Sequence, residues 1–116
     1  MVALISLSIL EYESGLAADL NRLTISKPFS EICELVSSGK IHSLHVDIMR
    51  PPLIPSRVSF PVDLVRPVYE NFRGRVVLEM HLMVKTPDPL IHELSEFIEP
   101  KQRPKTPMIV HTEAYN

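Results

Sequence analysis

Cysteine is almost absent from this sequence, and neither sign of charge dominates it. The single cysteine, Cys33, excludes an internal disulfide and a cysteine-based metal cluster. The formal net charge of -2, from 12 basic and 14 acidic side chains, gives no basic excess for a nucleic-acid partner. No apolar run is long enough to span a bilayer, and the apolar N-terminus has no basic leader. We therefore expect a cytoplasmic protein that binds neither nucleic acid nor membrane.

Length bounds the fold that the chain can form. Its 116 residues, 45% of them hydrophobic, predict a single globular domain over residues 1–116. A complete (β/α)₈ barrel takes roughly 250 residues, so this chain can supply about half of one. Most of the 11 prolines fall in residues 51–67 and 87–107, where we expect loops.

Short apolar stretches alternate with amphipathic ones along the chain. The pattern predicts strands at 3–10, 41–49, 75–84 and 108–113 and helices at 16–23, 28–38, 61–72 and 88–98. Pro67 weakens the third helix, because proline lacks the N–H that a helix interior needs. The order β-α-β-α-β-α-β implies a parallel sheet with right-handed crossovers. We predict an α/β protein, a partial TIM-type (β/α) barrel with about four parallel strands and crossover helices.

Polar residues recur late in the predicted strands, on the face opposite the apolar residues. Side chains alternate along a strand, so residues two apart share a face. The residues on this shared polar face are Ser6 and Ser8 in the first strand, His45, Asp47 and Met49 in the second, Glu79, His81 and Met83 in the third, and His111 and Glu113 in the fourth. In α/β barrels, catalytic groups gather at this end of the strands.

Two imidazoles and a carboxylate from adjacent strands suit a divalent ion such as zinc, iron, manganese or cobalt. Each element of the pattern also has a plain structural explanation. A His-x-Asp pair on a strand is common, His81 alone could be a hydrogen-bonded core histidine, and Met49 and Met83 could simply pack. The joint occurrence on four strands is what favours a metal site at His45, Asp47 and His81.

Four ordered motifs resemble those of the ribulose-phosphate 3-epimerase family. Two further segments, 54–56 and 59–61, resemble degraded versions of the family's second-strand loop. The motifs that match are Ser8-Ile9-Leu10, His45-Val46-Asp47-Ile48-Met49, His81-Leu82-Met83 followed by Pro87-Asp88, and Val110-His111-Thr112-Glu113. They span nearly the whole chain, one on each predicted strand.

The resemblance implies a chemistry for these residues. It implies that His45, Asp47 and His81 hold a divalent metal and that Asp47 is one of two acid/base carboxylates. The family's reaction moves a proton off and onto C3 of a phosphorylated ketopentose through an enediolate. Ser8, His81, Met49 and Met83 would contact or surround this substrate. A carboxylate beside a dication stays ionised, and the same ion stabilises the developing oxyanion, which suits this chemistry.

The sequence also departs from the family. The second acid/base aspartate, which is also the fourth ligand, and the phosphate-binding loops belong to the family's second half, which has no counterpart in these 116 residues. Arg50-Pro51 replaces the family's Asp-Gly, and residues 11–28 contain an apparent insertion. We therefore expect an epimerase homologue that is weakly active or inactive alone.

Other interpretations remain open. The chain could be a non-catalytic interaction or half-barrel protein, or a truncated gene product. A homo-oligomer or a second half-barrel partner would close the two open edges that half a barrel exposes. A decarboxylase or aldolase-type synthase is a weaker alternative, because those families do not share the His-x-Asp and His-Leu-Met pair.

Overall fold

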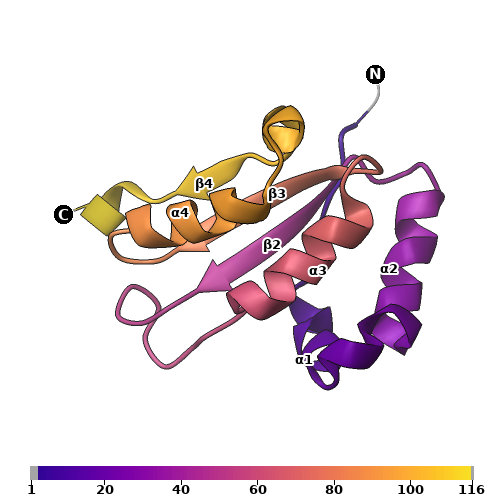
Figure 1. Ribbon diagram of the computed structural model, residues 1–116, viewed down its shortest axis with the longest axis horizontal. Coiled ribbons are helices and arrows are strands. Elements are labelled where there is room, and N and C mark those ends of the chain that lie inside the picture. The colour runs from indigo at the N-terminus through magenta and orange to yellow at the C-terminus, as the bar shows by residue number, and fades with distance from the viewer. Residues whose placement is uncertain (1–2, 116) are drawn as a thin grey trace.

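The computed structural model describes residues 3–115 and contains one sheet with its connecting helices (Figure 1). The strands are β1 (Ser6–Ser8), β2 (Ser43–Met49), β3 (Val77–Met83) and β4 (Met108–Val110). The α-helices are α1 (Glu13–Ala17), α2 (Lys27–Ser37), α3 (Val62–Phe72) and α4 (Asp88–Phe97). Short 3-10 turns complete the order: η1 (Leu10–Tyr12), η2 (Leu20–Ile25), η3 (Pro100–Lys105) and η4 (Thr112–Tyr115).

The four strands form a parallel sheet in the order β1-β2-β3-β4. Each strand lies beside its neighbour in sequence, with helical segments in every connection. The register places Asp47 opposite His81, and His81 opposite Ile109. The predicted α/β class and the parallel four-stranded sheet are confirmed, and the arrangement is compatible with part of a barrel.

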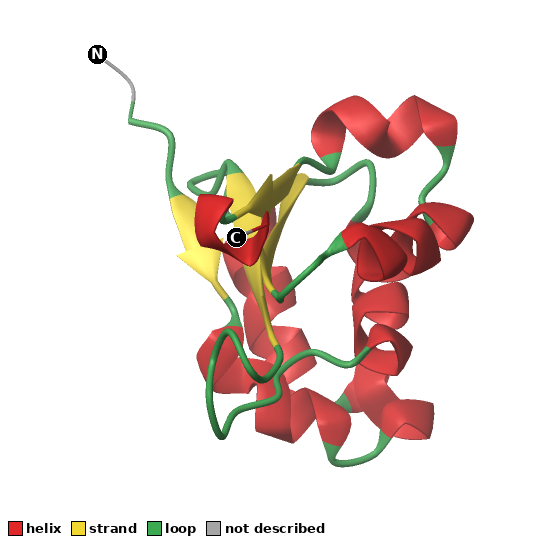
Figure 2. Cartoon of the chain, turned by 90° about the vertical axis from the view of Figure 1, so that its left-hand side faces the viewer, coloured by secondary structure: helices red, strands yellow, loops and turns green. Residues whose placement is uncertain are grey.

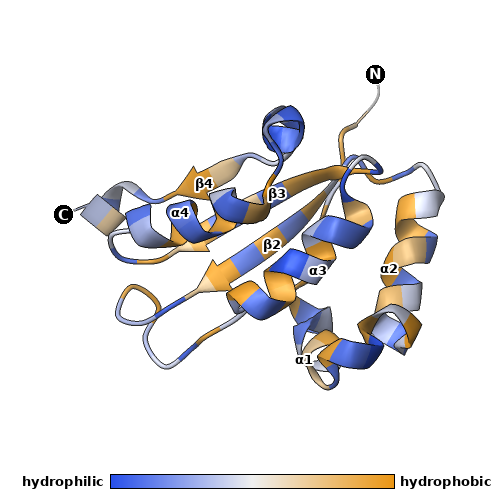
Figure 3. Ribbon diagram, in the orientation of Figure 1, coloured by the Kyte–Doolittle hydropathy of each residue, from blue (hydrophilic) through white to orange (hydrophobic). Residues whose placement is uncertain are grey.

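The larger helices cover one side of the sheet, as Figure 2 shows. The residues of the two central strands, β2 and β3, on that side are apolar and buried, as are the aromatic residues of α3 that pack in the same core. In β2 the covered residues are Leu44, Val46 and Ile48, and in β3 they are Leu78, Met80 and Leu82. Figure 3 shows the resulting alternation of apolar and polar residues along β2. The opposite side of the sheet carries the polar residues, so burial of one face exposes a row of functional groups on the other.

Local signals in the sequence account for the helix ends. The Ser26 side chain accepts a hydrogen bond from the Phe29 N–H and caps the start of α2. Gly39 and Gly74 follow α2 and α3 with φ of 75° and 77°, the left-handed conformation that ends helices. Pro67 is tolerated inside α3.

Several predicted boundaries were wrong. The first strand covers only Ser6–Ser8 of the predicted 3–10, because the Ile9 carbonyl accepts the Tyr12 N–H and turns the chain. The predicted helix at 16–23 is two pieces, since Asp19 is extended and its side chain caps a new turn at Asn21. The fourth strand ends at Val110 instead of residue 113, and η4 begins at Thr112.

Candidate metal centre

His45, Asp47 and His81 converge on the open side of the sheet, as the strand alternation predicts. Asp47 and His81 lie opposite each other in the register of β2 and β3, and His45 precedes Asp47 by two residues on the same face. His45 Nε2 lies 3.1 Å from His81 Nδ1 and 3.1 Å from Asp47 Oδ1, and His81 Nδ1 lies 3.0 Å from Asp47 Oδ1. Their side chains are 24%, 13% and 22% exposed respectively, so the group is sheltered but accessible.

The three atoms form a nearly equilateral triangle that suits a divalent ion. Ligands about 2.1 Å from an ion lie about 3.0 Å apart in neighbouring octahedral positions and about 3.4 Å apart in a tetrahedron. The observed separations of 3.0–3.1 Å match the octahedral spacing more closely. This group, with two imidazoles and one carboxylate, could therefore hold a metal ion.

Glu79 contacts the other ring nitrogen of His45. Its Oε1 lies 3.3 Å from His45 Nδ1 and accepts hydrogen bonds from the Ser6 and Ser43 hydroxyls. The Ser6 hydrogen bond is the largest influence on this carboxyl and lowers its pKa, with His45 and Ser43 adding to the effect against partial burial. An ionised Glu79 accepts the His45 Nδ1–H, which leaves Nε2 with a free lone pair in the triangle.

His111 contacts the other ring nitrogen of His81. The two Nε2 atoms lie 2.7 Å apart, while the ring centres are 4.9 Å apart with planes 16° apart. Such close nitrogens between nearly parallel but distant rings require the rings to meet edge to edge, which is the geometry of an N–H···N hydrogen bond. His111 Nδ1 in turn lies 3.2 Å from Glu113 Oε1.

The remaining predicted site residues border the triangle. Ser8 donates a hydrogen bond to Asp47 Oδ2 at 3.1 Å, so the two oxygens of Asp47 have different partners. Met49 and Met83 lie opposite each other at the carboxyl ends of β2 and β3, two residues beyond Asp47 and His81. The prediction that Ser8, Met49 and Met83 surround a substrate stays a prediction.

Arg50 braces the loop that follows β2. Its guanidinium donates hydrogen bonds to the carbonyls of Met49, Ser59 and Phe60 at 2.8, 2.6 and 3.0 Å. Partial burial lowers the pKa of this guanidinium, as expected for a cation that is withdrawn from water. Arg50 thus clamps the loop from within by joining its two ends.

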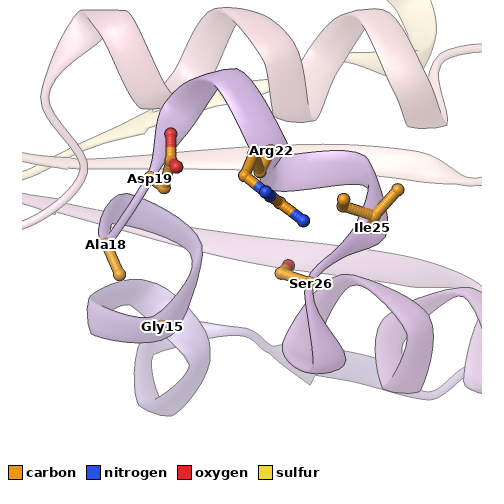
Figure 4. Close-up of a pocket in the computed structure, with 6 residues that line it drawn as sticks. All are labelled: Gly15, Ala18, Asp19, Arg22, Ile25 and Ser26. Atoms are coloured by element: carbon orange, nitrogen blue, oxygen red, sulfur yellow. The ribbon is translucent and has the colours of Figure 1, made fainter.

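A pocket of about 370 Å³ lies beside the site, lined by Ser8, Leu10, Glu11 and Arg57. Because Ser8 contacts Asp47, this pocket opens next to the metal-ligand group. A second pocket, of about 290 Å³, lies in the α1–α2 region and is shown in Figure 4. Its Asp19 and Ser26 side chains cap η2 and α2, which gives both a structural role.

Two contributors to the site, Glu79 and His111, were not assigned roles from the sequence. Both were placed on the polar face by alternation, but the metal pattern needed only three ligands. The available signal was their position: Glu79 lies two residues before His81 on β3, and His111 directly follows β4. Glu113 was expected to face the site from a strand, and instead lies in η4, where its carboxylate contacts His111.

Comparison of the sequence with protein-family models and with curated proteins finds no match. The epimerase resemblance therefore rests on the motifs themselves. In residues 3–115, none of the helices has the length and apolar character needed to cross a bilayer.

Proposed function

We propose that this chain is a ribulose-phosphate 3-epimerase homologue whose sheet is half of a TIM-type barrel. The observation that carries the proposal is the convergence of His45, Asp47 and His81 into a triangle with edges of 3.0–3.1 Å. The same three residues occupy the metal-ligand positions of the motifs that resemble the family. The phosphorylated ketose would lie over the open face of the sheet.

The donor set fits a resident divalent ion, with zinc, iron, manganese and cobalt all compatible with imidazole and carboxylate ligands. With His45 Nδ1–H donated to Glu79 and His81 Nε2–H donated to His111, three lone pairs meet within 3.1 Å. A cation relieves the repulsion between them. A bound ion would polarise the carbonyl of the substrate and so acidify the neighbouring carbon.

Asp47 is the residue that we assign to proton transfer. Its Oδ1 faces the two histidines, and its Oδ2 accepts the Ser8 hydroxyl hydrogen bond. This division leaves Oδ2 to remove and return the C3 proton while Oδ1 stays in the triangle. The Ser8 hydrogen bond fixes the direction in which Oδ2 points, which serves a general base.

Epimerisation needs proton transfer on both faces of C3, and Asp47 can serve only one. We therefore expect the chain alone to bind metal but to convert ketopentose phosphate slowly or not at all. Asp47 alone can exchange the C3 proton with solvent. Measuring this exchange is therefore more sensitive than measuring conversion to the epimer.

The experiment follows ribulose 5-phosphate in D₂O by NMR, with the purified chain and added Zn²⁺, Mn²⁺ or Co²⁺. Deuterium at C3 reports proton abstraction, and xylulose 5-phosphate reports inversion. We expect slow, metal-dependent exchange with little inversion. Asp47→Asn should abolish the exchange and weaken metal binding, whereas the exposed control Asp63→Asn on α3 should change neither.

Three other outcomes would change the assignment. Metal-dependent inversion that Asp47→Asn abolishes would show a second acid/base group and contradict the expected inactivity. Metal binding without exchange would limit the function to a metal-holding homologue. Absence of both would favour a non-catalytic interaction protein, an alternative that the exposed aliphatic residues at the sheet edges, Leu4, Ile5, Ile109 and Val110, support.

A further inference from the structure

The two ligand histidines reach a carboxylate by different routes. His45 contacts Glu79 directly, with 3.3 Å between Nδ1 and Oε1. The outer nitrogen of His81, Nε2, contacts His111. His111 then contacts Glu113 through its other ring nitrogen.

The hydrogen bonds along this second route indicate which ring nitrogens of His111 and His81 carry protons. Glu113 is acceptor-only when ionised, and its pKa is lowered by its own backbone N–H, then by Thr112 and His111. The 3.2 Å contact with Glu113 places a proton on His111 Nδ1, and in the singly protonated ring this leaves a lone pair on Nε2. With the His111 proton on that side, the 2.7 Å contact is made by His81 donating its Nε2–H, and His81 Nδ1 then faces Asp47 Oδ1 at 3.0 Å. That tautomer leaves His81 Nδ1 as a lone pair in the triangle.

We propose that His111 is a positioning residue that, anchored by Glu113, holds His81 in the Nε2–H tautomer and so presents Nδ1 to a cation. The proposal rests on the metal site of the proposed function. It adds His111, which follows β4, and Glu113 of η4 to a site otherwise built from β1, β2 and β3. Partners of this kind fix the ring orientation of metal-bound histidines and raise their basicity.

The contacts from Glu113 to His111 and from His111 to His81 explain how the end of β4 can affect a site on β2 and β3. The β3–β4 register ends at Val110, so His111 leaves the ladder at the point where its ring can meet that of His81. The Ala114 N–H is bonded to the His111 carbonyl at 3.1 Å, which folds η4 back. This turn brings the Glu113 carboxylate to the outer nitrogen of His111.

The first measurement is the tautomer of His81 in the metal-free protein, read from the ¹⁵N shifts of its ring by long-range NMR correlation. We expect the Nε2–H form in the wild type and loss of that preference in His111→Phe, which removes the acceptor. His111→Gln keeps an acceptor oxygen and should restore the preference in part. A wild-type His81 in the Nδ1–H form, or a preference that survives His111→Phe, would overturn the inference.

The second measurement is Zn²⁺ affinity, by competition with a chromophoric chelator. Loss of an outer-shell partner lowers metal affinity about 10–100-fold, so we expect a decrease of that size for His111→Phe and a smaller one for His111→Gln and Glu113→Gln. The matched control is His92→Phe, because His92 pairs with Glu96 at 3.5 Å on the exposed face of α4, away from the ligands. Equal Zn²⁺ affinity in His111→Phe and the wild type would contradict the proposal.

The two measurements separate this inference from the proposed function. A wild type whose His81 is in the Nε2–H form only while His111 is present, but which has no affinity for Zn²⁺, Mn²⁺ or Co²⁺, would overturn the metal-dependent function and leave only the control of the His81 tautomer by His111; the affinity comparison between His111→Phe and the wild type applies when the wild type binds Zn²⁺. An equal affinity loss in His111→Gln and His111→Phe, with lower melting temperatures for both, would show a merely structural role and overturn the positioning role.

Discussion

Glu79 orients His45 from the side of the ring that faces away from the three ligand atoms. We predict that Glu79→Gln lowers Zn²⁺ affinity about tenfold, because a neutral amide accepts the His45 Nδ1–H less strongly than a carboxylate. Gln retains the size of Glu, so the contacts with Ser6 and Ser43 can persist. Chelator competition measures the change.

The control for this prediction is Glu70→Gln. Glu70 lies on α3, is 53% exposed and pairs with Arg66 at 2.8 Å, so it contributes nothing to the site. Unchanged affinity in Glu79→Gln, or an equal decrease in Glu70→Gln, would contradict the role assigned to Glu79.

The three ligand positions could be predicted from sequence because they depend only on strand alternation and on the adjacency of β2 and β3. The roles of Glu79 and His111 could not be predicted, because they depend on distances between side chains of different strands. The Ser6 and Ser43 hydroxyls approach Glu79 from β1 and β2. His111 meets His81 only because β4 stops at Val110, a boundary that the apolar pattern placed three residues too late.

At the scale of elements, the loop after β2 is held by one side chain. We predict that Arg50→Gln lowers the free energy of unfolding by about 2 kcal/mol, because hydrogen bonds to charged groups contribute about 1.5–3 kcal/mol each and Gln can replace only part of them. It should also speed hydrogen exchange in residues 50–60. Urea denaturation and exchange mass spectrometry measure the two effects.

Arg66→Gln is the matched control on α3. The Arg66–Glu70 pair is exposed and spaced i,i+4, so its loss should cost well under 1 kcal/mol. A stability loss in Arg50→Gln no larger than that in Arg66→Gln would mean that the three carbonyl contacts do not brace the loop.

The helical connections show why element type was easier to predict than element length. α2 and α3 carry wide apolar stripes and end two residues before Gly39 and Gly74, and the bounds of both helices were predicted to within one residue. The segment from Leu10 to Ile25 has no stripe long enough to set one helix, and Asp19 divides it. Capping by this single polar residue divided the helix predicted at 16–23.

At the scale of the whole molecule, the sheet is covered on one side and its edge strands have one neighbour each in the part of the chain described. Val110 lies opposite Leu82 in the register, yet Val110 is 38% exposed and Leu82 is fully buried. Leu4 and Ile5, which lead into β1, are 73% and 49% exposed. Unpaired strand edges with aliphatic side chains readily join other chains.

We predict that the isolated chain self-associates through the β4 edge and that Val110→Lys reduces this association, because a charge on an edge strand opposes further pairing. Size-exclusion chromatography with light scattering, over a range of protein concentrations, should show a mass that rises with concentration for the wild type and stays near 13.2 kDa for the variant. Leu35→Lys is the matched control, since Leu35 is 37% exposed but lies on α2, away from either edge. A wild type that remains monomeric at every concentration would contradict the prediction. Equal loss of association in Leu35→Lys would move the interface from the strand edge to the helical side.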